Sequence, residues 1–202
     1  HAEKIELACS KYPRKSEPGD VWVYHTTDTY ILGTAMAEFL KEKMGPTADI
    51  YQDLLVEPLW SKLGLSPTLS NTRRTYDDRG QTFAGWGLVL ERADLAKLVA
   101  FLQDGTGAIG SEQILDREML EGALQRNAQD RGLRATNEDF RYNNGFWAWN
   151  YRDFGGCNAD TWIPFMSGFG GLSAVLMPNG ASYYYVSDGY EFTWGSAVQA
   201  TE

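Results

Sequence analysis

Histidine and cysteine are scarce in this 202-residue chain, which contains two of each. His1, His25, Cys9 and Cys157 show neither zinc-finger nor HExxH spacing, so no structural zinc site is expected. A Ser-His-Asp triad would have to use one of the two histidines. Nucleophilic chemistry in this chain would therefore favour tyrosine or lysine as its base.

Positive charge is also limited, because 18 Lys and Arg stand against 27 Asp and Glu, for a net charge of −9. A nucleic-acid partner is not expected, since binding phosphates needs a basic face. No apolar run approaches the roughly 18–20 residues of a membrane helix, so no membrane span is expected. Residues 1–6 lack the pattern of a signal peptide, which is either absent or removed.

The two cysteines leave two alternatives open. Cys9 and Cys157 could form a disulfide, or both could be buried free thiols. A disulfide would favour a periplasmic or secreted protein, because cytosolic disulfides are rare. The localisation is otherwise undetermined by the sequence.

The composition, with 43% hydrophobic and 22% charged residues, indicates a globular fold. Hydrophobic spacing predicts helices over 27–44, 50–60, 93–102 and 116–125, with Thr27 or Asp28 as the first N-cap. We expect an irregular segment over 1–20, a short β-like run over 21–24, and loops over 66–83 and 126–141.

Alternating hydrophobicity predicts strands later in the chain, over 146–151, 172–177 and 182–187. The last two should form a hairpin around Asn179-Gly180, and a helix should begin near Phe192. The fold class is therefore α+β, with an antiparallel sheet flanked by helices. The chain reads as one domain segment over 1–202, helical over about 27–125 and with its sheet over about 145–190.

Three short segments could carry chemistry. Tyr24 follows the Pro18-Gly19 turn and precedes a helix, so it is either a base in a cleft or a core tyrosine. The glycine-rich run over 166–171 could aim backbone N–H groups at an oxyanion, or could form a bulge. The run over 83–88 is interpreted as a tight packing turn.

Taken in order, these segments resemble the β-lactamase-related serine hydrolases, which include class C β-lactamases, esterases and 6-aminohexanoate-dimer hydrolases. The resemblance covers roughly residues 10–200 and rests on the order and spacing of its motifs. The matching motifs are Pro18-Gly19, Tyr24-His25-Thr26, Glu57-Pro58-Leu59-Trp60, Gly85-Trp86-Gly87, Ala93-Asp94-Leu95-Ala96, Met166-Ser167-Gly168 and the hairpin from Pro178 to Gly180.

This resemblance implies a β-lactamase/transpeptidase-like fold that is incomplete at its N-terminal side. The family nucleophile is the serine of a Ser-x-x-Lys motif, which these 202 residues do not contain, so a missing N-terminal segment is an expected partner. Tyr24 would be the catalytic base or acid, and the N–H of Phe169 one oxyanion-hole donor. Ser167, Gly168 and Thr26 would bind a small-molecule ester or amide substrate, with no cofactor.

Two other functions remain open. Met166 stands where the family has Lys or His, which removes a cation and favours a non-catalytic binding or sensor domain on the same fold. A cluster of Trp147, Trp149 and Trp162 could instead mark a carbohydrate-binding module. The predicted helices speak against that module, because such modules are usually all-β.

Overall fold

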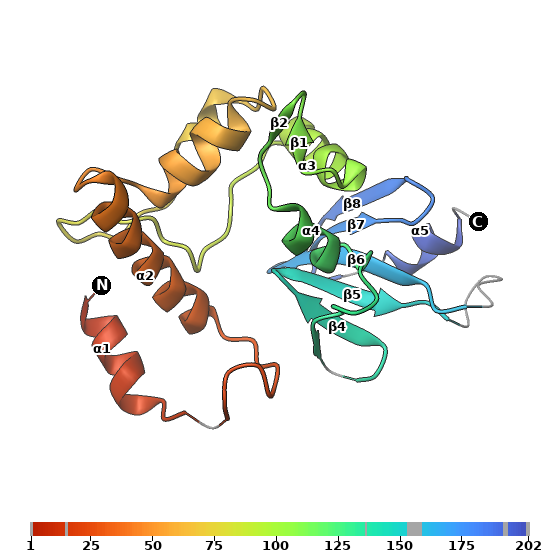
Figure 1. Ribbon diagram of the computed structural model, residues 1–202, viewed down its shortest axis with the longest axis horizontal. Coiled ribbons are helices and arrows are strands. Elements are labelled where there is room, and N and C mark those ends of the chain that lie inside the picture. The colour runs from red at the N-terminus through yellow and green to blue at the C-terminus, as the bar shows by residue number, and fades with distance from the viewer. Residues whose placement is uncertain (1, 15, 136, 153–158, 192–193, 201–202) are drawn as a thin grey trace. The chain divides into compact units, whose positions relative to one another are not determined.

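The computed structural model describes residues 2–14, 16–135, 137–152, 159–191 and 194–200. It has an α+β fold, as the sequence predicts, with helices and a six-stranded antiparallel sheet (Figure 1). Contacts divide the chain into two compact units. The first contains His1–Pro18 and Val23–Asp94, and the second contains Gly19–Trp22 and Leu95–Glu202.

The first unit is helical. Its elements are α1 (Ala2–Lys11), α2 (Thr26–Met44), the π-helix η1 (Gln52–Trp60), the 3-10 helix η2 (Pro67–Ser70) and the first residues of α3 (Arg92–Asp104). The helix α1 contradicts the irregular segment expected over 1–20. The reason is local, since Ala, Glu, Lys and Leu dominate its first turns and are strong helix formers.

Helix α2 confirms the helix predicted over 27–44, but its start differs. Its N-cap is His25, which makes no side-chain capping bond, so the prediction of Thr27 or Asp28 as the cap is wrong. The β-like run predicted over 21–24 is not a strand. Gly45 ends the helix with a φ of 107°, a backbone conformation that glycine adopts without steric cost.

The helix predicted over 50–60 forms as η1, with wider turns than expected. Its last residues bond five positions back, as in the N–H of Ser61 to the carbonyl of Val56 at 2.9 Å. Pro58 lies inside the helix and has no N–H to donate, which favours such a departure from α geometry. Leu59 is buried in this helix, whereas Leu54 is 40% exposed.

The second unit is built on the antiparallel sheet, whose strands follow one another in chain order. They are β3 (Leu133–Arg134), β4 (Phe140–Asn143), β5 (Phe146–Asn150), β6 (Trp162–Gly168), β7 (Leu172–Leu176) and β8 (Ser182–Val186). Strand β5 confirms the strand predicted over 146–151. The pairing of β7 with β8 confirms the predicted hairpin around Asn179-Gly180.

Two parts of this sheet were not expected. The loop predicted over 126–141 is wrong in part, because it contains β3 and the start of β4. Only Phe140 and Tyr142 alternate there with charged or polar neighbours, which is too short a pattern to read as a strand. Strand β6 contains Pro164 opposite Ala148 in the middle of the sheet, where a residue without an N–H is unusual.

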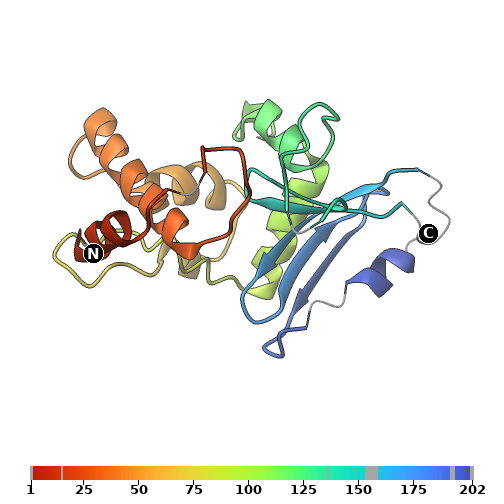
Figure 2. The same cartoon turned by 90° about the horizontal axis from the view of Figure 1, so that it is seen from below.

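Helices cover both faces of the sheet. Helix α5 (Gly195–Gln199) lies on one face, and α3 with α4 (Arg117–Ala123) lies on the other, as Figures 1 and 2 show together. A two-stranded hairpin of β1 (Ala108–Ile109) and β2 (Glu112–Gln113) joins α3 to α4. The helix predicted to begin near Phe192 is therefore present as α5, and Phe192 itself lies outside the described residues.

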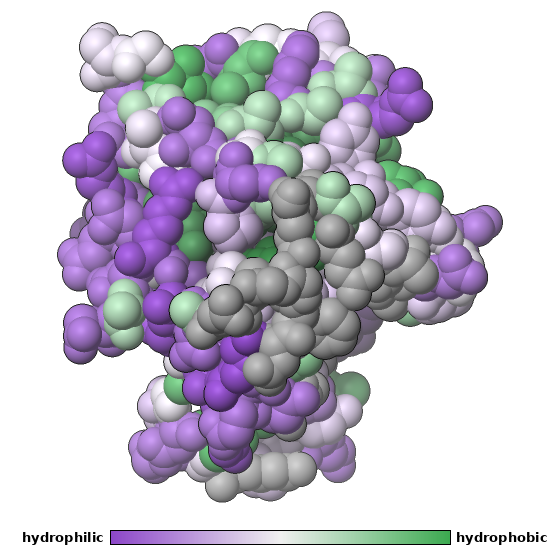
Figure 3. All heavy atoms as spheres, turned by 90° about the vertical axis from the view of Figure 1, so that its right-hand side faces the viewer, coloured by the Kyte–Doolittle hydropathy of each residue, from purple (hydrophilic) through white to green (hydrophobic). Residues whose placement is uncertain are grey.

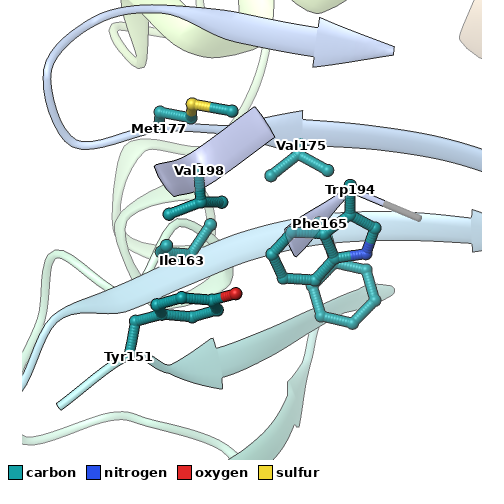
Figure 4. Close-up of a cluster of buried hydrophobic side chains, with 7 residues drawn as sticks. All are labelled: Tyr151, Ile163, Phe165, Val175, Met177, Trp194 and Val198. Atoms are coloured by element: carbon teal, nitrogen blue, oxygen red, sulfur yellow. The ribbon is translucent and has the colours of Figure 1, made fainter. Parts of the chain in front are cut away.

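The buried cluster under α5 is the core of this unit on that face. Trp194 and Val198 of the C-terminal segment pack against Ile163, Phe165 and Val175 (Figure 4). The rings of Phe165 and Trp194 have their centroids 4.9 Å apart. Burial of such aromatic and aliphatic side chains is the main stabilising contribution to a fold of this kind.

Polar and apolar residues are interspersed on the face drawn in Figure 3. None of the helices in the described ranges is both long and apolar enough to cross a bilayer.

Candidate functional site

Tyr24 lies in the irregular segment that leads into α2. Its side chain is 58% exposed, so it is not the core tyrosine that was the alternative interpretation. The next residue, His25, is extended, with φ −136° and ψ 127°, and its carbonyl accepts the N–H of Asp28 at 3.0 Å. Thr26 is the first residue of α2 and is exposed.

The glycine-rich turn over 83–88 packs against the start of α2. A Cβ built on Gly85 would lie 2.9 Å from Cγ2 of Thr26, and a Cβ built on Gly33 would lie 2.6 Å from Cβ of Ala84. The rings of Tyr30 and Phe83 meet edge to face at 5.1 Å. The interpretation as a packing turn is therefore confirmed, and this turn supports the segment that carries Thr26.

The glycine-rich run over 166–171 forms the end of β6 and the turn into β7. Ser167 pairs with Ser173, and Gly168 pairs with Leu172. Gly170 and Gly171 have φ angles of 94° and 103°, which other residues rarely adopt.

A second segment lies close against this turn. The carbonyl of Gly170 accepts the N–H of Tyr190 at 3.0 Å, and a Cβ on Gly171 would lie 2.8 Å from the carbonyl oxygen of Glu191. Phe169 is 87% exposed, and its ring contacts Tyr190 edge to face at 5.2 Å. The positive φ angles and the close neighbouring segment thus explain why glycine stands at positions 170 and 171, without any role in binding.

The predicted site residues fall into two groups. Ser167, Gly168 and Phe169 are consecutive in one hairpin of the second unit, and Tyr24 and Thr26 lie two residues apart in the first unit. The placement of Tyr24 against Phe169 remains a prediction from the resemblance.

The aromatic residues of the sheet have a structural role. Trp147 and Trp149 pack against the buried cluster under α5, and Trp149 contacts Trp194 edge to face at 5.3 Å. Trp162 lies against the guanidinium groups of Arg131 and Arg141, at 5.5 and 5.3 Å. The interpretation of Trp147 and Trp149 as core residues is the one that the contacts favour.

The cysteines give a partial answer. Cys9 on α1 is exposed and carries a free thiol, so the alternative of a buried thiol is wrong for Cys9, and Cys157 lies outside the described residues. In the described ranges, His, Cys, Asp and Glu form no cluster that could hold a metal ion.

Sequence reasoning missed a polar cavity in the first unit. The cavity has a volume of about 180 Å³ and is bordered by Lys41, Asp49, Arg74, Arg79 and Gln81. Its residues come from the end of α2, the turn before η1 and the loop after η2, which are far apart in the sequence.

Asp49 and Arg74, which both border this cavity, form an ion pair with two hydrogen bonds. Nη1 and Nη2 of Arg74 donate to the carboxylate at 2.6 and 3.1 Å. The backbone N–H groups of Tyr51 and Gln52 also donate to Oδ1 of Asp49, at 3.1 and 3.0 Å, so Asp49 caps the helical run that leads into η1.

The pKa of Asp49 reflects these contacts. Burial by itself would raise it, but the hydrogen bonds from Arg74, Gln52 and Tyr51 and the charge of Arg74 together hold the pKa below its ordinary value. The bond to Asp49 in turn raises the pKa of Arg74. A charged pair is therefore built into one wall of the cavity.

No family model matches this chain, and no curated protein matches it significantly.

Proposed function

We propose that this chain forms part of a serine hydrolase that cleaves an ester or amide bond through an acyl-enzyme. The observation that carries the proposal is the ordered series of motifs resembling the β-lactamase-related hydrolases, with an exposed Tyr24 directly before a helix. The antiparallel sheet with α5 on one face agrees with the α+β class of those enzymes. The specific β-lactamase-like topology is part of this proposal.

In this mechanism the nucleophile is a serine of a Ser-x-x-Lys segment outside these 202 residues. Tyr24 acts as the general base and takes the serine proton while the serine oxygen attacks the carbonyl carbon of the substrate. The protonated Tyr24 then gives that proton to the leaving alcohol or amine as the acyl–oxygen or acyl–nitrogen bond breaks. A water molecule then attacks the acyl-enzyme with Tyr24 again as the base. Tyr24 returns the proton to the serine oxygen as the carboxylic acid leaves.

The backbone N–H of Phe169 would stabilise the oxyanion that forms at each tetrahedral stage. Such donors are effective because they are fixed before the charge develops. The hairpin supports this role, since Phe169 directly follows Gly168, which pairs with Leu172 in the β6–β7 ladder. Ser167, Gly168 and Thr26 would contact the substrate.

Tyr24→Phe tests the mechanism in the complete gene product. The change keeps the ring and removes only the hydroxyl, so turnover of p-nitrophenyl butyrate should fall about 10²- to 10⁴-fold, the range for loss of a general acid or base. Stability should change by no more than about 1 kcal/mol, the net contribution of one hydrogen bond. A fluorophosphonate probe should label the wild-type serine.

The matched control is Tyr76→Phe, because Tyr76 is 92% exposed in the same unit and its hydroxyl accepts a bond from Arg73 at 3.2 Å. This variant should keep wild-type turnover. Full activity of Tyr24→Phe would remove Tyr24 from the mechanism.

A non-catalytic binding or sensor domain is the second candidate. Met166 favours it, since its thioether cannot replace the cation that the family has at this position, and here it pairs with Ala174 in the β6–β7 ladder. Absence of fluorophosphonate labelling and of ester hydrolysis in the complete gene product would decide for this alternative.

A further inference from the structure

We propose that the substrate of the hydrolase is neutral and carries an apolar acyl group, and that Leu172 and Phe169 determine this specificity. The proposal rests on the proposed function, because it concerns the substrate whose oxyanion the N–H of Phe169 would hold. It is carried by the side chains and the charges that surround the turn between β6 and β7.

Leu172 covers the end of the strand that leads to Phe169. Gly168 pairs with Leu172, and Leu172 pairs with Val186, so the three residues lie opposite one another on β6, β7 and β8 (Figure 1). Side chains at opposed positions share one face of a sheet. A Cβ built on Gly168 would lie 3.1 Å from Cβ and from Cδ1 of Leu172. A group that approaches Gly168 from this face therefore contacts Leu172.

Four exposed apolar or aromatic side chains gather at this turn, and we call them the apolar turn surface. They are Phe169, Leu172, Val186 and Tyr190. The rings of Phe169 and Tyr190 contact each other, and the N–H of Tyr190 is bound to the carbonyl of Gly170 at 3.0 Å. Apolar side chains that gather at one place, unlike those scattered singly, mark a binding surface.

The charges of this part of the chain disfavour an anionic substrate. Residues 153–202 contain no Lys, Arg or His, so β6, β7, β8 and their turns offer no cation to a carboxylate. Met166, two residues before Gly168, is uncharged as well. Two exposed acids, Asp188 and Glu191, flank Tyr190. A carboxylate on the substrate would therefore meet charge of its own sign, which opposes binding.

A neutral acyl chain has the opposite relation to this surface. The carbonyl carbon whose oxygen the N–H of Phe169 would hold also bears the acyl chain, so the chain starts beside the apolar turn surface. An apolar chain gains by leaving water together with Leu172 and Phe169. A carboxylate in its place would lose hydration and gain no partner on these strands. The surface thus selects neutral acyl groups by both terms.

Two esters that differ in one terminal group test the proposal on the complete gene product. p-Nitrophenyl valerate ends in a methyl group, and mono-p-nitrophenyl glutarate has a carboxylate at the same position. The kcat/KM for the valerate should exceed that for the glutarate by at least about 10-fold, because an unpaired charge is disfavoured at least as strongly as a lost methylene. Equal kcat/KM values, or a preference for the glutarate, would overturn the proposal.

Two variants locate the specificity, and a third is the control. Leu172→Lys places a cation beside Gly168, so the ratio of the two kcat/KM values should fall by about 10-fold as the glutarate improves. Phe169→Ala removes an exposed ring and should lower kcat/KM for the valerate several-fold, but not that for the glutarate. Met119→Lys adds the same charge at an exposed position of α4, which contacts β4, and should leave the ratio unchanged. An unchanged ratio in a folded Leu172→Lys would overturn the proposal.

Amide binding separates a failure of this proposal from a failure of the hydrolase proposal. Hydrolysis of neither ester, together with no fluorophosphonate labelling, would contradict the hydrolase. Titration calorimetry with valeramide and glutaramate then makes the same comparison without hydrolysis. Tighter binding of valeramide that is lost in Leu172→Lys would support the specificity of the surface. Equal affinities, or binding of neither amide, would overturn it.

Discussion

At the scale of single residues, Asp49 illustrates how one side chain serves two purposes. It caps the helical run into η1 through the N–H groups of Tyr51 and Gln52, and it holds Arg74 from the loop after η2. Its own N–H is in turn accepted by Asp53 at 2.8 Å. The carboxylate thereby ties a local capping interaction to a contact between segments 25 residues apart.

Asp49→Asn should lower stability in a pH-dependent way. Because the folded pKa of Asp49 is below its ordinary value, its carboxylate contributes stability above the unfolded pKa of about 3.9, and this contribution is lost as the pH falls through the folded pKa. The variant should unfold about 1–2 kcal/mol more easily at pH 7. This difference should shrink toward pH 3.

Urea unfolding between pH 3 and pH 8 measures this dependence. Asp78→Asn changes an exposed carboxylate in the loop after η2, which also carries Arg74, and should shift stability by less than about 0.5 kcal/mol. A loss for Asp49→Asn that stays constant down to pH 3 would show that the charge of Asp49 is not what stabilises the fold.

At the scale of elements, the turn between β6 and β7 explains why glycine is needed in the run over 166–171. Gly171 is needed for two reasons, a φ of 103° and the close carbonyl of Glu191. Gly180 in the next hairpin turn has a φ of 86°, and a Cβ built on it would meet no other atom within 4 Å. A substitution at Gly180 therefore tests backbone strain alone, whereas a substitution at Gly171 tests backbone strain together with steric crowding.

Gly171→Ala should destabilise the protein by more than Gly180→Ala does. Strain at a positive φ alone costs about 1–2 kcal/mol, and that is the expected loss for Gly180→Ala. Gly171→Ala should exceed it by at least about 1 kcal/mol, since Cβ would lie 2.8 Å from a backbone oxygen that cannot move freely. Equal losses in thermal unfolding would contradict this account of the turn.

At the scale of the whole molecule, the chain has two compact units, each with its own buried residues. Leu40, Leu59 and Trp60 are buried in the first unit, whereas Ile163 and Val175 are buried in the second. Stability need not be uniform across such a structure, because regions with separate cores can open separately.

Val175→Ala tests that independence. Val175 is fully buried, and removal of its two methyl groups should cost about 2 kcal/mol. In native-state hydrogen exchange, amides of β5 to β8 should lose protection while those of α2 and η1 keep theirs. Val186→Ala, at a position 61% exposed in β8, is the control. Equal loss of protection in both units would mean that they unfold as one.

The sequence alone determined the parts of this protein that depend on local patterns. Helix α2, strand β5 and the β7–β8 hairpin follow from hydrophobic periodicity and from the Asn179-Gly180 turn, which act over a few neighbouring residues. The α+β class followed from the order of these elements. Tyr24 and the run over 166–171 are candidates because their residue types stand beside turns and strand starts, and their role stays a prediction.

Only the tertiary structure decided what depends on distant partners. Pro164 is tolerated in a central strand, and Arg141 lies in a strand, because neighbouring strands supply the pairing that local propensity opposes. The polar cavity was not predictable for the same reason. No local sequence pattern links Lys41, Asp49 and Gln81. They border the same cavity only because the loop after η2 folds back beside the end of α2.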